Sequence, residues 1–340
     1  MRVVVVGGGL TGLSAVIQLA ADGTEAILVE SGDTLGGRVK FHETGDWIID
    51  PGLHLLRSKG PLNQLLRKLR APRILGSKFL KNEFFSIPPH DNLGLSKLGN
   101  MSMNSEVEVS NDLIIPRDGW SSIIGRLIVA INQLNVEIFI NSHVDSINLK
   151  NKKVKSIIVN GQKINCDKLI LAIPPSAASS LLKTASLKTS ELDSCTPQSF
   201  AALDVALEAK VMSPYSGLYD HDSGIIAVDV AQKDRIPAGR RPEDCSIIHA
   251  VNLRGDGNDS LEAIKDFLDS RCSGWRKYVS KRRSTPSIMI HPCHLDERIE
   301  ATIYASSGII LAGPHVISDY TLSDASVFTG RNASKLINLH

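Results

Sequence analysis

The stretch that decides the fold lies at the start of the chain: Val3-Val4-Val5-Val6-Gly7-Gly8-Gly9-Leu10-Thr11-Gly12. The β-branched run that opens it is typical of a parallel strand buried on both faces of a sheet. Gly7 permits a tight turn out of this strand, Gly9 lets the backbone approach a diphosphate closely, and Gly12 lets the next helix pack against the sheet. The stretch therefore predicts a dinucleotide-binding turn between a strand and a helix.

A helix and a second strand complete this unit. Leu13, Val16, Ile17 and Ala20 recur at helical spacing, so we expect a helix that begins near Leu10 and Thr11 and aims its first N–H groups at the phosphates. The apolar run 26–29 predicts the second strand, and the carboxylate of Glu30 at its end can accept hydrogen bonds from both hydroxyls of an adenosine ribose. Glu30 follows Gly12 at close to the usual spacing of about 20 residues. A carboxylate here argues against NADP, whose 2′-phosphate requires a cation.

The next two motifs suggest a particular dinucleotide. Gly36-Gly37-Arg38 follows Glu30 and Ser31 and resembles the GG-R signature of the flavin amine oxidase and phytoene desaturase superfamily, which includes protoporphyrinogen oxidase. In that superfamily the arginine lies near the flavin diphosphate. Asp50-Pro51-Gly52-Leu53-His54 resembles the turn that approaches the isoalloxazine ring. The resemblance implies FAD, and not NAD, as the cofactor.

Two blocks in the middle of the chain continue the resemblance. Asn141-Ser142-His143-Val144 resembles the strand whose valine backbone contacts adenine. The segment 167–174, which includes Ala172, resembles the strand and turn that end the second FAD-binding segment.

The C-terminal block resembles the closing strand and helix of the same superfamily. Residues 309–313, which end at Gly313, match the strand, and the helix is expected over 325–331. Its N-terminus, with Ser326 and Val327, would face the flavin pyrimidine carbonyl and stabilise negative charge there. The acid that usually follows the Ala-Gly pair is replaced by Pro314-His315. The ribityl contact must therefore come from water, backbone or another side chain.

Segments with these motifs alternate with segments of a different character. Residues 1–57, 117–182 and 300–340 are expected to form a discontinuous FAD-binding domain, and residues 58–116 and 183–299 a substrate domain. The predicted fold class is α/β, a Rossmann-like domain with a parallel sheet and an interleaved α+β substrate domain on a mixed or antiparallel sheet. Cofactor sites commonly lie at such a domain boundary.

Composition is that of an ordinary globular protein. The chain has 340 residues, of which 42% are hydrophobic and 22% charged, and its formal net charge is +2. This charge gives no reason to expect a nucleic-acid partner, and no window reaches the ~18 apolar residues of a membrane span. We therefore expect a cytoplasmic protein.

The five cysteines are widely spaced and form no CxxC pair, which favours reduced thiols over a disulfide framework or a zinc site. Cys293 lies in His291-Pro292-Cys293-His294. A metal cluster, or a covalent flavin on the cysteine as in some amine oxidases, is an alternative here. Because the proline argues against one helical face, a strand end and turn is preferred, and no metal is predicted.

The segment 57–81 contains eight basic residues and no acid. Leu62, Leu65, Leu66 and Leu69 repeat at helical spacing, which predicts an amphipathic helix. Such a helix can be an ordinary one with a core face, or it can lie in an anionic membrane interface. Peripheral contact of residues 57–81 with a membrane stays an alternative, because the resembled desaturases take lipid-like substrates.

Two motifs that the sequence lacks limit the reactions that we expect. The chain has no second GxGxxG and no CxxC, so electrons are expected to pass from a small organic substrate to flavin N5 and then to oxygen, a quinone or a carrier protein. His54 and His315 are the candidate catalytic residues, because neutral imidazole can accept a proton near physiological pH. The Ile- and Leu-rich inserts favour an apolar substrate and an oxidase or desaturase.

Three other interpretations stay open. An amine oxidase would release hydrogen peroxide and would use aromatic rings and a lysine, for which Trp275, Tyr278, Tyr304 and Lys210 are available. A non-redox flavoprotein such as UDP-galactopyranose mutase would need arginines for the diphosphate, and Arg235, Arg240 and Arg241 are candidates, although a solvated loop is the simpler interpretation. A flavin-binding module without catalytic function is the third.

Overall fold

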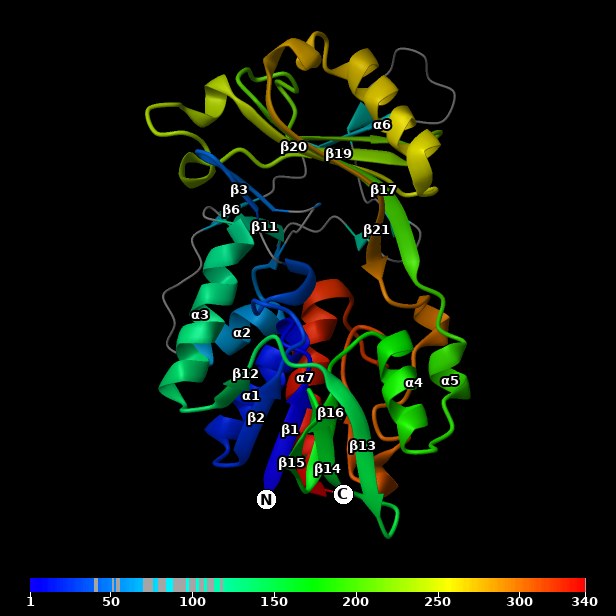
Figure 1. Ribbon diagram of the computed structural model, residues 1–340. Helices are drawn as coiled ribbons and strands as arrows, with labels where there is room; N and C mark the ends of the chain where they lie inside the picture. Colours follow the sequence, from blue (N-terminus) through cyan, green and yellow to red (C-terminus); the bar gives the residue numbers. More distant parts are fainter. Residues whose placement is uncertain are drawn as a thin grey trace.

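The computed structural model describes residues 1–39, 42–50, 52, 56–69, 76–78, 84–87, 96–97, 102–103, 107–108, 113–116 and 119–339. These residues form two units, each built around a sheet, with both chain termini at the far end of the first unit (Figure 1). The long strands β17 (Gln198–Leu207) and β21 (Val279–His291) extend from the second unit toward the first.

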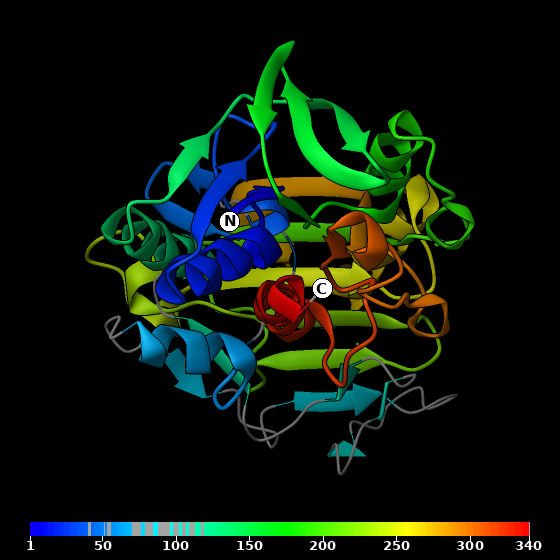
Figure 2. The same ribbon diagram turned by 90° about the horizontal axis from the view of Figure 1, so that it is seen from below.

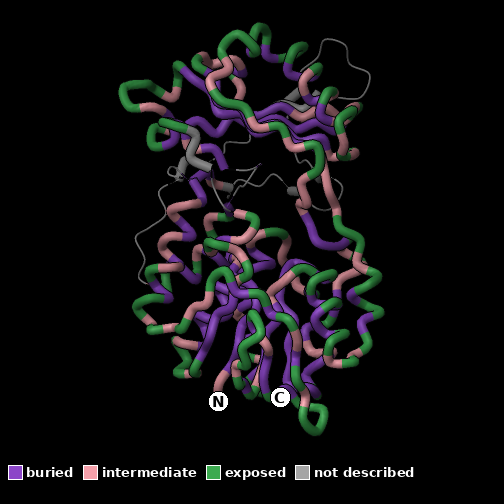
Figure 3. The backbone as a smooth tube through the Cα atoms, viewed as in Figure 1, coloured by how far each residue is buried: buried purple, intermediate pink, exposed green. Residues whose placement is uncertain are grey.

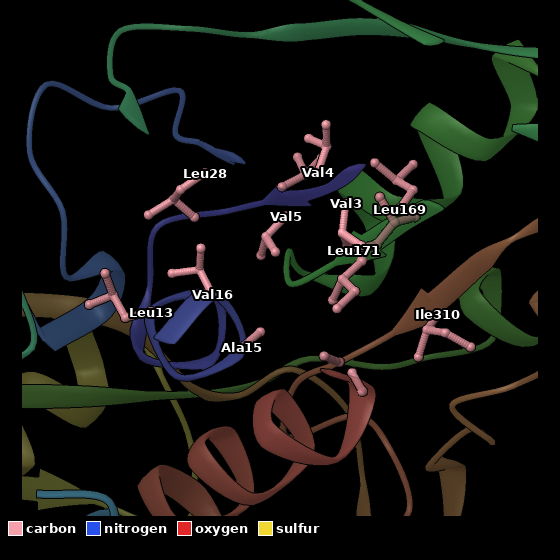
Figure 4. Packing of buried hydrophobic residues seen from close by; sticks show 14 of the residues in the cluster. Val3, Val4, Val5, Leu13, Ala15, Val16, Leu28, Leu169, Leu171 and Ile310 are labelled. Carbon is pink, nitrogen blue, oxygen red and sulfur yellow. The ribbon is translucent and has the colours of Figure 1, made fainter. Parts of the chain in front are cut away.

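The first unit is built on a parallel sheet. In spatial order its strands are β12 (Glu137–Phe139), β2 (Glu25–Val29), β1 (Arg2–Val6), β16 (Lys168–Leu171) and β22 (Ile309–Leu311). All four neighbouring pairs run parallel. Helices cover both faces, so the apolar strands are buried on both sides, as the unbroken valine run predicts. Figure 4 shows Val3, Val4 and Val5 of β1 between Leu28 and the β16 leucines.

Helices pack around this sheet. They are α1 (Leu10–Ala21), α2 (Pro61–Lys68), α3 (Gly119–Gln133), α4 (Pro175–Thr184), α5 (Ser190–Asp193) and α7 (Leu322–Leu339). α1 lies between α3 and α7 and is buried from Leu10 to Leu19; Figure 2 shows α1 and α7 side by side. The predicted helix is thus confirmed, and it is buried on all sides instead of along one face.

The second unit is a seven-stranded mixed sheet. Its order is β21, β17, β20 (Ser246–Asn252), β19 (Ile225–Asp229), β18 (Gly217–Asp220), β7 (Phe84–Ile87) and β8 (Ser96–Lys97). Only β18 and β7 are parallel neighbours. The outer face packs against α6 (Gly257–Arg271), and the inner face packs against Trp47 and Ile49. Figure 3 shows that the strands of this sheet are largely buried.

Smaller strands and 3-10 turns complete the described chain. The strands are β3 (His42–Thr44) with β4 (Trp47–Ile49), β5 (Leu56–Arg57) with β11 (Leu113–Pro116) and β6 (Gly76–Lys78), β9 (Ser102–Met103) with β10 (Val107–Glu108), and β13 (Val144–Lys150) with β14 (Lys153–Val159) and β15 (Gln162–Asn165). The 3-10 turns are η1 (Gly37–Val39), η3 (Lys233–Arg235), η4 (Pro242–Asp244), η5 (Trp275–Tyr278), η6 (Leu295–Glu297) and η7 (Ala305–Ser307).

Two elements lie on the other side of the expected domain boundaries. Leu62, Leu65 and Leu66 of α2 are buried in the core of the parallel-sheet unit, although residues 58–116 were assigned to the substrate domain. Trp47 and Ile49 pack into the core of the seven-stranded unit, although residues 1–57 were assigned to the FAD-binding domain. Hydrophobic spacing shows that a helix has a core face, but it does not show which core that face joins.

The burial of α2 also corrects the membrane expectation. The leucines at 62, 65 and 66 are at most 3% exposed, so the described apolar face of this helix packs against protein and is not available to a lipid surface. Among the described helices, none combines the length and apolarity needed to cross a bilayer.

Candidate cofactor site

The first candidate residues gather at the carboxyl ends of β1 and β16. The chain runs from β1 outward to β2 and β12, and then returns to the other side of β1 to form β16 and β22. In such sheets ligands bind at the carboxyl edge where the strand order reverses. Gly7 follows β1 and Ala172 follows β16, and the Ala172 N–H donates to the Val6 carbonyl at 2.9 Å. The topology therefore places the glycine turn at this switch point.

The three glycines of the turn differ in what surrounds them. Gly12 lies so close to the first turn that an added Cβ would be 1.8 Å from the Gly7 carbonyl oxygen. Gly7 has φ +103°, a conformation that favours glycine. At Gly9, by contrast, the only heavy atom near an added Cβ is the Gly37 Cα, at 3.8 Å. Gly7 and Gly12 are therefore required by the fold itself, whereas Gly9 faces open space in which a diphosphate could lie.

Glu30 is fixed at the end of β2 by two backbone amides. One carboxylate oxygen accepts a hydrogen bond from Gly8 N–H and the other from Gly32 N–H, each at 2.6 Å. The oxygen bonded to Gly32 also accepts the Ser31 hydroxyl at 3.4 Å, the oxygen bonded to Gly8 keeps a second lone pair, and the residue is only half-buried. The amides orient the carboxylate; one ribose hydroxyl could bond the free position, and the other could replace the long Ser31 contact.

The predicted adenine strand lies beside Glu30. The N–H groups of Asn141 and Ser142 donate to the carbonyls of Gly32 and Glu30, at 2.8 and 2.9 Å. Val144 then begins β13. These bonds place residues 141 and 142 beside the end of β2; that Val144 contacts adenine stays a prediction.

Arg38 lies next to the glycine turn. The Gly36 N–H donates to the Gly8 carbonyl at 2.9 Å, which joins the GG-R segment to the glycine turn. Desolvation lowers the pKa of the Arg38 guanidinium, although the residue is exposed. One guanidinium nitrogen, Nη1, donates to the Ile290 carbonyl at 3.1 Å, and the other N–H groups of this cation suit a phosphate.

His315 is not placed as a proton acceptor should be. It is 1% exposed, and its ring packs against Gly313, where an added Cβ would be 2.6 Å from Cε1. Burial, together with smaller electrostatic repulsion from His291 and Arg38, lowers the pKa of His315 to about 3. The prediction that His315 accepts a proton from substrate is therefore not supported, because a neutral ring with no open surface cannot reach one. The other candidate, His54, lies outside the described residues, as does Leu53.

The helix expected over 325–331 begins earlier, at Leu322. Ser326 is therefore one turn inside the helix, where its hydroxyl donates to the Leu322 carbonyl at 3.1 Å, and Val327 is fully buried. The N–H groups that an intrahelical bond leaves free belong to the first turn, so residues 322–324 occupy the position assigned to Ser326 and Val327. Gly313, at the end of β22, donates its N–H to Thr329 Oγ1 of the same helix at 3.0 Å.

Buried charges hold the segment that carries the Asp50 and Gly52 motif. Asp50 forms an ion pair with Arg235 and accepts the Trp120 N–H at 3.1 Å. Both side chains of the pair are at most 3% exposed. Burial lowers the pKa of Arg235 to about 10, which leaves it cationic at neutral pH. Arg235 is thus a structural partner of Asp50, not part of a solvated loop.

A second buried pair was not predicted from the sequence. Asp204 on β17 accepts a hydrogen bond from His249 Nδ1 at 2.7 Å, and its two carboxylate oxygens accept the Gly52 N–H at 3.1 and 3.2 Å. Asp204 and His249 each interrupt an apolar strand, in Leu203-Asp204-Val205 and Ile248-His249-Ala250. A polar residue inside a buried strand was the signal, but the separation of 45 positions hides the pairing.

The remaining candidates are scattered. Trp275 packs with α6 on the outer face of the second sheet, Tyr278 is 45% exposed, and Lys210 forms an ion pair with Asp229 at 2.9 Å. Tyr304 is buried in the first core and its hydroxyl donates to the Lys188 carbonyl at 2.7 Å. These four residues do not form an aromatic cage with a lysine. Arg240 pairs with Glu208, and Arg241 with Asp244.

The His291 to His294 segment is a strand end and turn, as preferred. β21 ends at His291, whose Nδ1 is hydrogen-bonded to the Cys293 carbonyl. Cys293 is fully buried, and burial raises the pKa of its thiol to about 12. All five cysteines are free thiols. Within the described residues, no group of three or more potential ligands could hold a metal ion.

Comparisons with known proteins agree with this geometry. Residues 5–69 match the family model of the NAD(P)-binding Rossmann-like domain, and residues 96–234 match that of flavin containing amine oxidoreductase. A 70-residue segment is 39% identical to the all-trans-zeta-carotene desaturase of Myxococcus xanthus; it covers 20% of this chain and 13% of the desaturase. The chain thus matches only a small part of that relative's length.

Two solved structures share the fold over nearly the whole chain. An oxidoreductase from Methanosarcina mazei superposes with a TM-score of 0.77 at 15% identity, covering 98% of this chain and 99% of the other. Cyclohexylamine oxidase from Brevibacterium oxydans IH-35A gives a TM-score of 0.70 at 14% identity, covering 99% and 98%. At these identities the likeness concerns the fold.

Proposed function

We propose that this chain is a member of the superfamily of flavin-containing amine oxidases and phytoene desaturases, and that it is an FAD-dependent oxidoreductase that oxidises a small, apolar organic substrate. FAD is the cofactor that fits the site, and it would supply the two-electron chemistry when bound. The protein's own residues must hold it, orient the substrate and exclude water.

One observation carries the proposal. The open space at Gly9 and the Arg38 cation belong to two segments that are joined by the hydrogen bond from the Gly36 N–H to the Gly8 carbonyl. A diphosphate needs a close backbone approach and a countercharge, and both are present at the switch point of the sheet. We assign the diphosphate to the backbone of Gly7 to Gly12 with Gly36, Gly37 and Arg38, and the adenosine to Glu30, Ser31 and Val144.

The flavin end is assigned to three other segments. These are Ala172 after β16, Gly313 after β22 with the first turn of α7, and the segment around Gly52. Ser326 and Val327 would act there through their helix only, because the structure places them beyond its first turn.

The composition of the inner face of the seven-stranded sheet favours an apolar substrate. The inner face of that sheet consists of small and aliphatic residues, among them Ala202, Ile226 and Val251. Two carboxylates on this side are engaged in pairs, Asp204 with His249 and Asp50 with Arg235, and Arg283, the β21 register partner of Asp204, adds a further cation. A cationic amine would find no unpaired carboxylate among these two pairs. This supports an oxidase or desaturase over an amine oxidase.

The mutase interpretation lacks its arginines. Arg235 is buried against Asp50, and Arg240 and Arg241 are paired with acids. The electron acceptor is oxygen, a quinone or a carrier protein, and each is a separate arm of the test below.

The experiment starts with the visible spectrum of the purified protein, which should show a flavin band. Gly9→Val should abolish FAD retention without unfolding the protein, because its methyl groups occupy the open space and meet no protein atom closer than Gly37. Gly125→Val is the matched control, since an added Cβ in α3 meets nothing within 4 Å. A Gly9→Val protein that is yellow and fully loaded would refute the assignment of the diphosphate.

The reaction class is tested by anaerobic addition of substrates. Bleaching of the flavin band by apolar lipids or isoprenoids supports the proposal, and re-oxidation by oxygen, quinone or a carrier identifies the acceptor. Bleaching by amines, with hydrogen peroxide formed in air, would show an amine oxidase instead. A mutase would turn over only after prior reduction.

A further inference from the structure

The buried pair of Asp204 and His249 lies on the inner face of the seven-stranded sheet, the face that is turned toward the parallel-sheet unit. The two residues are direct register partners on β17 and β20. Ala202 and Ala206, at alternate positions of β17, share this face and pack with Trp47. The other face of the same strands is apolar and packs against α6. Packing of the sheet therefore does not by itself require the charge of Asp204 on the inner face.

The pair has one described connection outside its own sheet, and it leads to Gly52. Burying a carboxylate is costly unless hydrogen bonds compensate it. His249 supplies one such bond, and the Gly52 N–H supplies the other, shared between both carboxylate oxygens. Gly52 has φ +74°, so its position depends on such an anchor more than that of an extended residue does.

Gly52 shares a support with Arg38. An added Cβ on Gly52 would lie 3.7 Å from Ile288 Cδ1, on β21. Two residues further along the same strand, the Ile290 carbonyl accepts the Arg38 guanidinium. Gly52 and the cation assigned to the diphosphate thus contact positions two residues apart on one strand.

We propose that Asp204, held by His249, is a positioning residue that fixes Gly52 beside the cofactor site. Through this contact the seven-stranded sheet would affect the affinity of the protein for FAD. The part that concerns FAD rests on the proposed function. The part that concerns Gly52 does not. Asp50, paired with Arg235, anchors the same segment from its other end.

The test compares Asp204→Ala and Asp204→Asn with a matched control, Asp229→Asn. Asp229 is also buried on this sheet and also accepts two backbone amides, from Ala231 and Ile247, but it does not contact Gly52. Asp204→Asn keeps an oxygen for the Gly52 N–H, so it separates the loss of charge from the loss of the acceptor.

The first measurement is amide hydrogen exchange around Gly52 in the FAD-free protein. Asp204→Ala should speed exchange about tenfold or more, the loss expected when a bond to a charged acceptor is removed, while Asp204→Asn and Asp229→Asn stay near wild type. Exchange that is equally slow in Asp204→Ala and in Asp229→Asn would overturn the proposal, whatever the melting temperatures.

The second measurement uses the FAD-loaded protein. Asp204→Ala should raise the FAD dissociation constant about tenfold or more and shift the flavin absorption band, whereas Asp229→Asn should change neither, even at an equal loss of melting temperature. Fast exchange with an unchanged dissociation constant and band would overturn the cofactor part alone. If the wild type binds no FAD, the proposed function has failed, and the exchange experiment still decides the role of Asp204.

Discussion

The two units of this molecule hold their polar groups in opposite ways. In the parallel-sheet unit the candidate site is made largely of backbone, with glycine amides and one strand-end carboxylate whose contacts join positions at most 28 residues apart. In the seven-stranded unit the polar groups are buried side-chain pairs, and their partners lie 45 and 185 positions apart. A site built from backbone can be predicted from a local motif. A site built from distant side chains exists only after the sheets have packed.

The largest effect is expected where the backbone site is most crowded. Gly12→Val should prevent the first unit from folding, because even its Cβ would be 1.8 Å from the Gly7 carbonyl oxygen. The soluble yield and the cooperative unfolding transition are the measurements, with Gly125→Ala as the control in an open helix position. A stable, cooperatively folded Gly12→Val protein would show that the turn is not as tight as described.

The next largest effect is expected when the buried ion pair of Asp50 and Arg235 is broken. Arg235→Leu should lower the free energy of unfolding by about 3 to 5 kcal/mol, because Asp50 is left as an uncompensated buried charge. Urea denaturation measures this. The double variant Asp50→Asn/Arg235→Leu should recover part of the loss, since the unpaired charge is gone. If the single and double variants are equally stable, the pair is not the anchor that its burial indicates.

A smaller effect is expected at the ribose end of the backbone site. Glu30→Ala should raise the FAD dissociation constant about ten- to a hundredfold, since hydrogen bonds to a charged acceptor are worth roughly 1.5 to 3 kcal/mol each. Titration followed by flavin fluorescence measures it. Glu25→Ala, which removes a surface acid from the start of the same strand, should leave the constant unchanged. Equal affinity in both variants would place the ribose elsewhere.

The smallest effect at neutral pH concerns His315. Its pKa in the folded protein is about 3, lowered from 6.5 by burial, so the unfolded chain binds a proton that the folded protein does not. The stabilisation is fully present above pH 6.5 and is lost as pH falls toward 3, by about 1.4 kcal/mol per pH unit. In the FAD-free protein, His315→Gln should therefore flatten the fall in stability between pH 6 and pH 4, the range between these two values. Parallel curves for the variant and the wild type would mean that the ring is not buried as a neutral group.

How far the sequence could be trusted differs between particular residues. Gly7, Gly9, Gly12 and Glu30 lie where the motif predicts because their spacing encodes one local turn. The end of the chain was predicted less well, since a helix that begins at Leu322 moves Ser326 and Val327 away from its free N–H groups. His315 was wrong as a proton acceptor because burial is a property of the packed fold and has no local signal.

The sequence by itself determined the first strand, the glycine turn, the helix after it and a dinucleotide site, because periodicity and short-range spacing act within one strand, turn and helix. The choice of FAD rests on the resemblance of the GG-R and Gly52 motifs. Only the tertiary structure decided that the α2 leucines join the first core and that Asp204, His249 and Arg235 hold the Asp50 and Gly52 segment. The reason is physical: a buried charge is tolerable only where the folded chain brings it a partner, and that partner can come from any distance along the sequence.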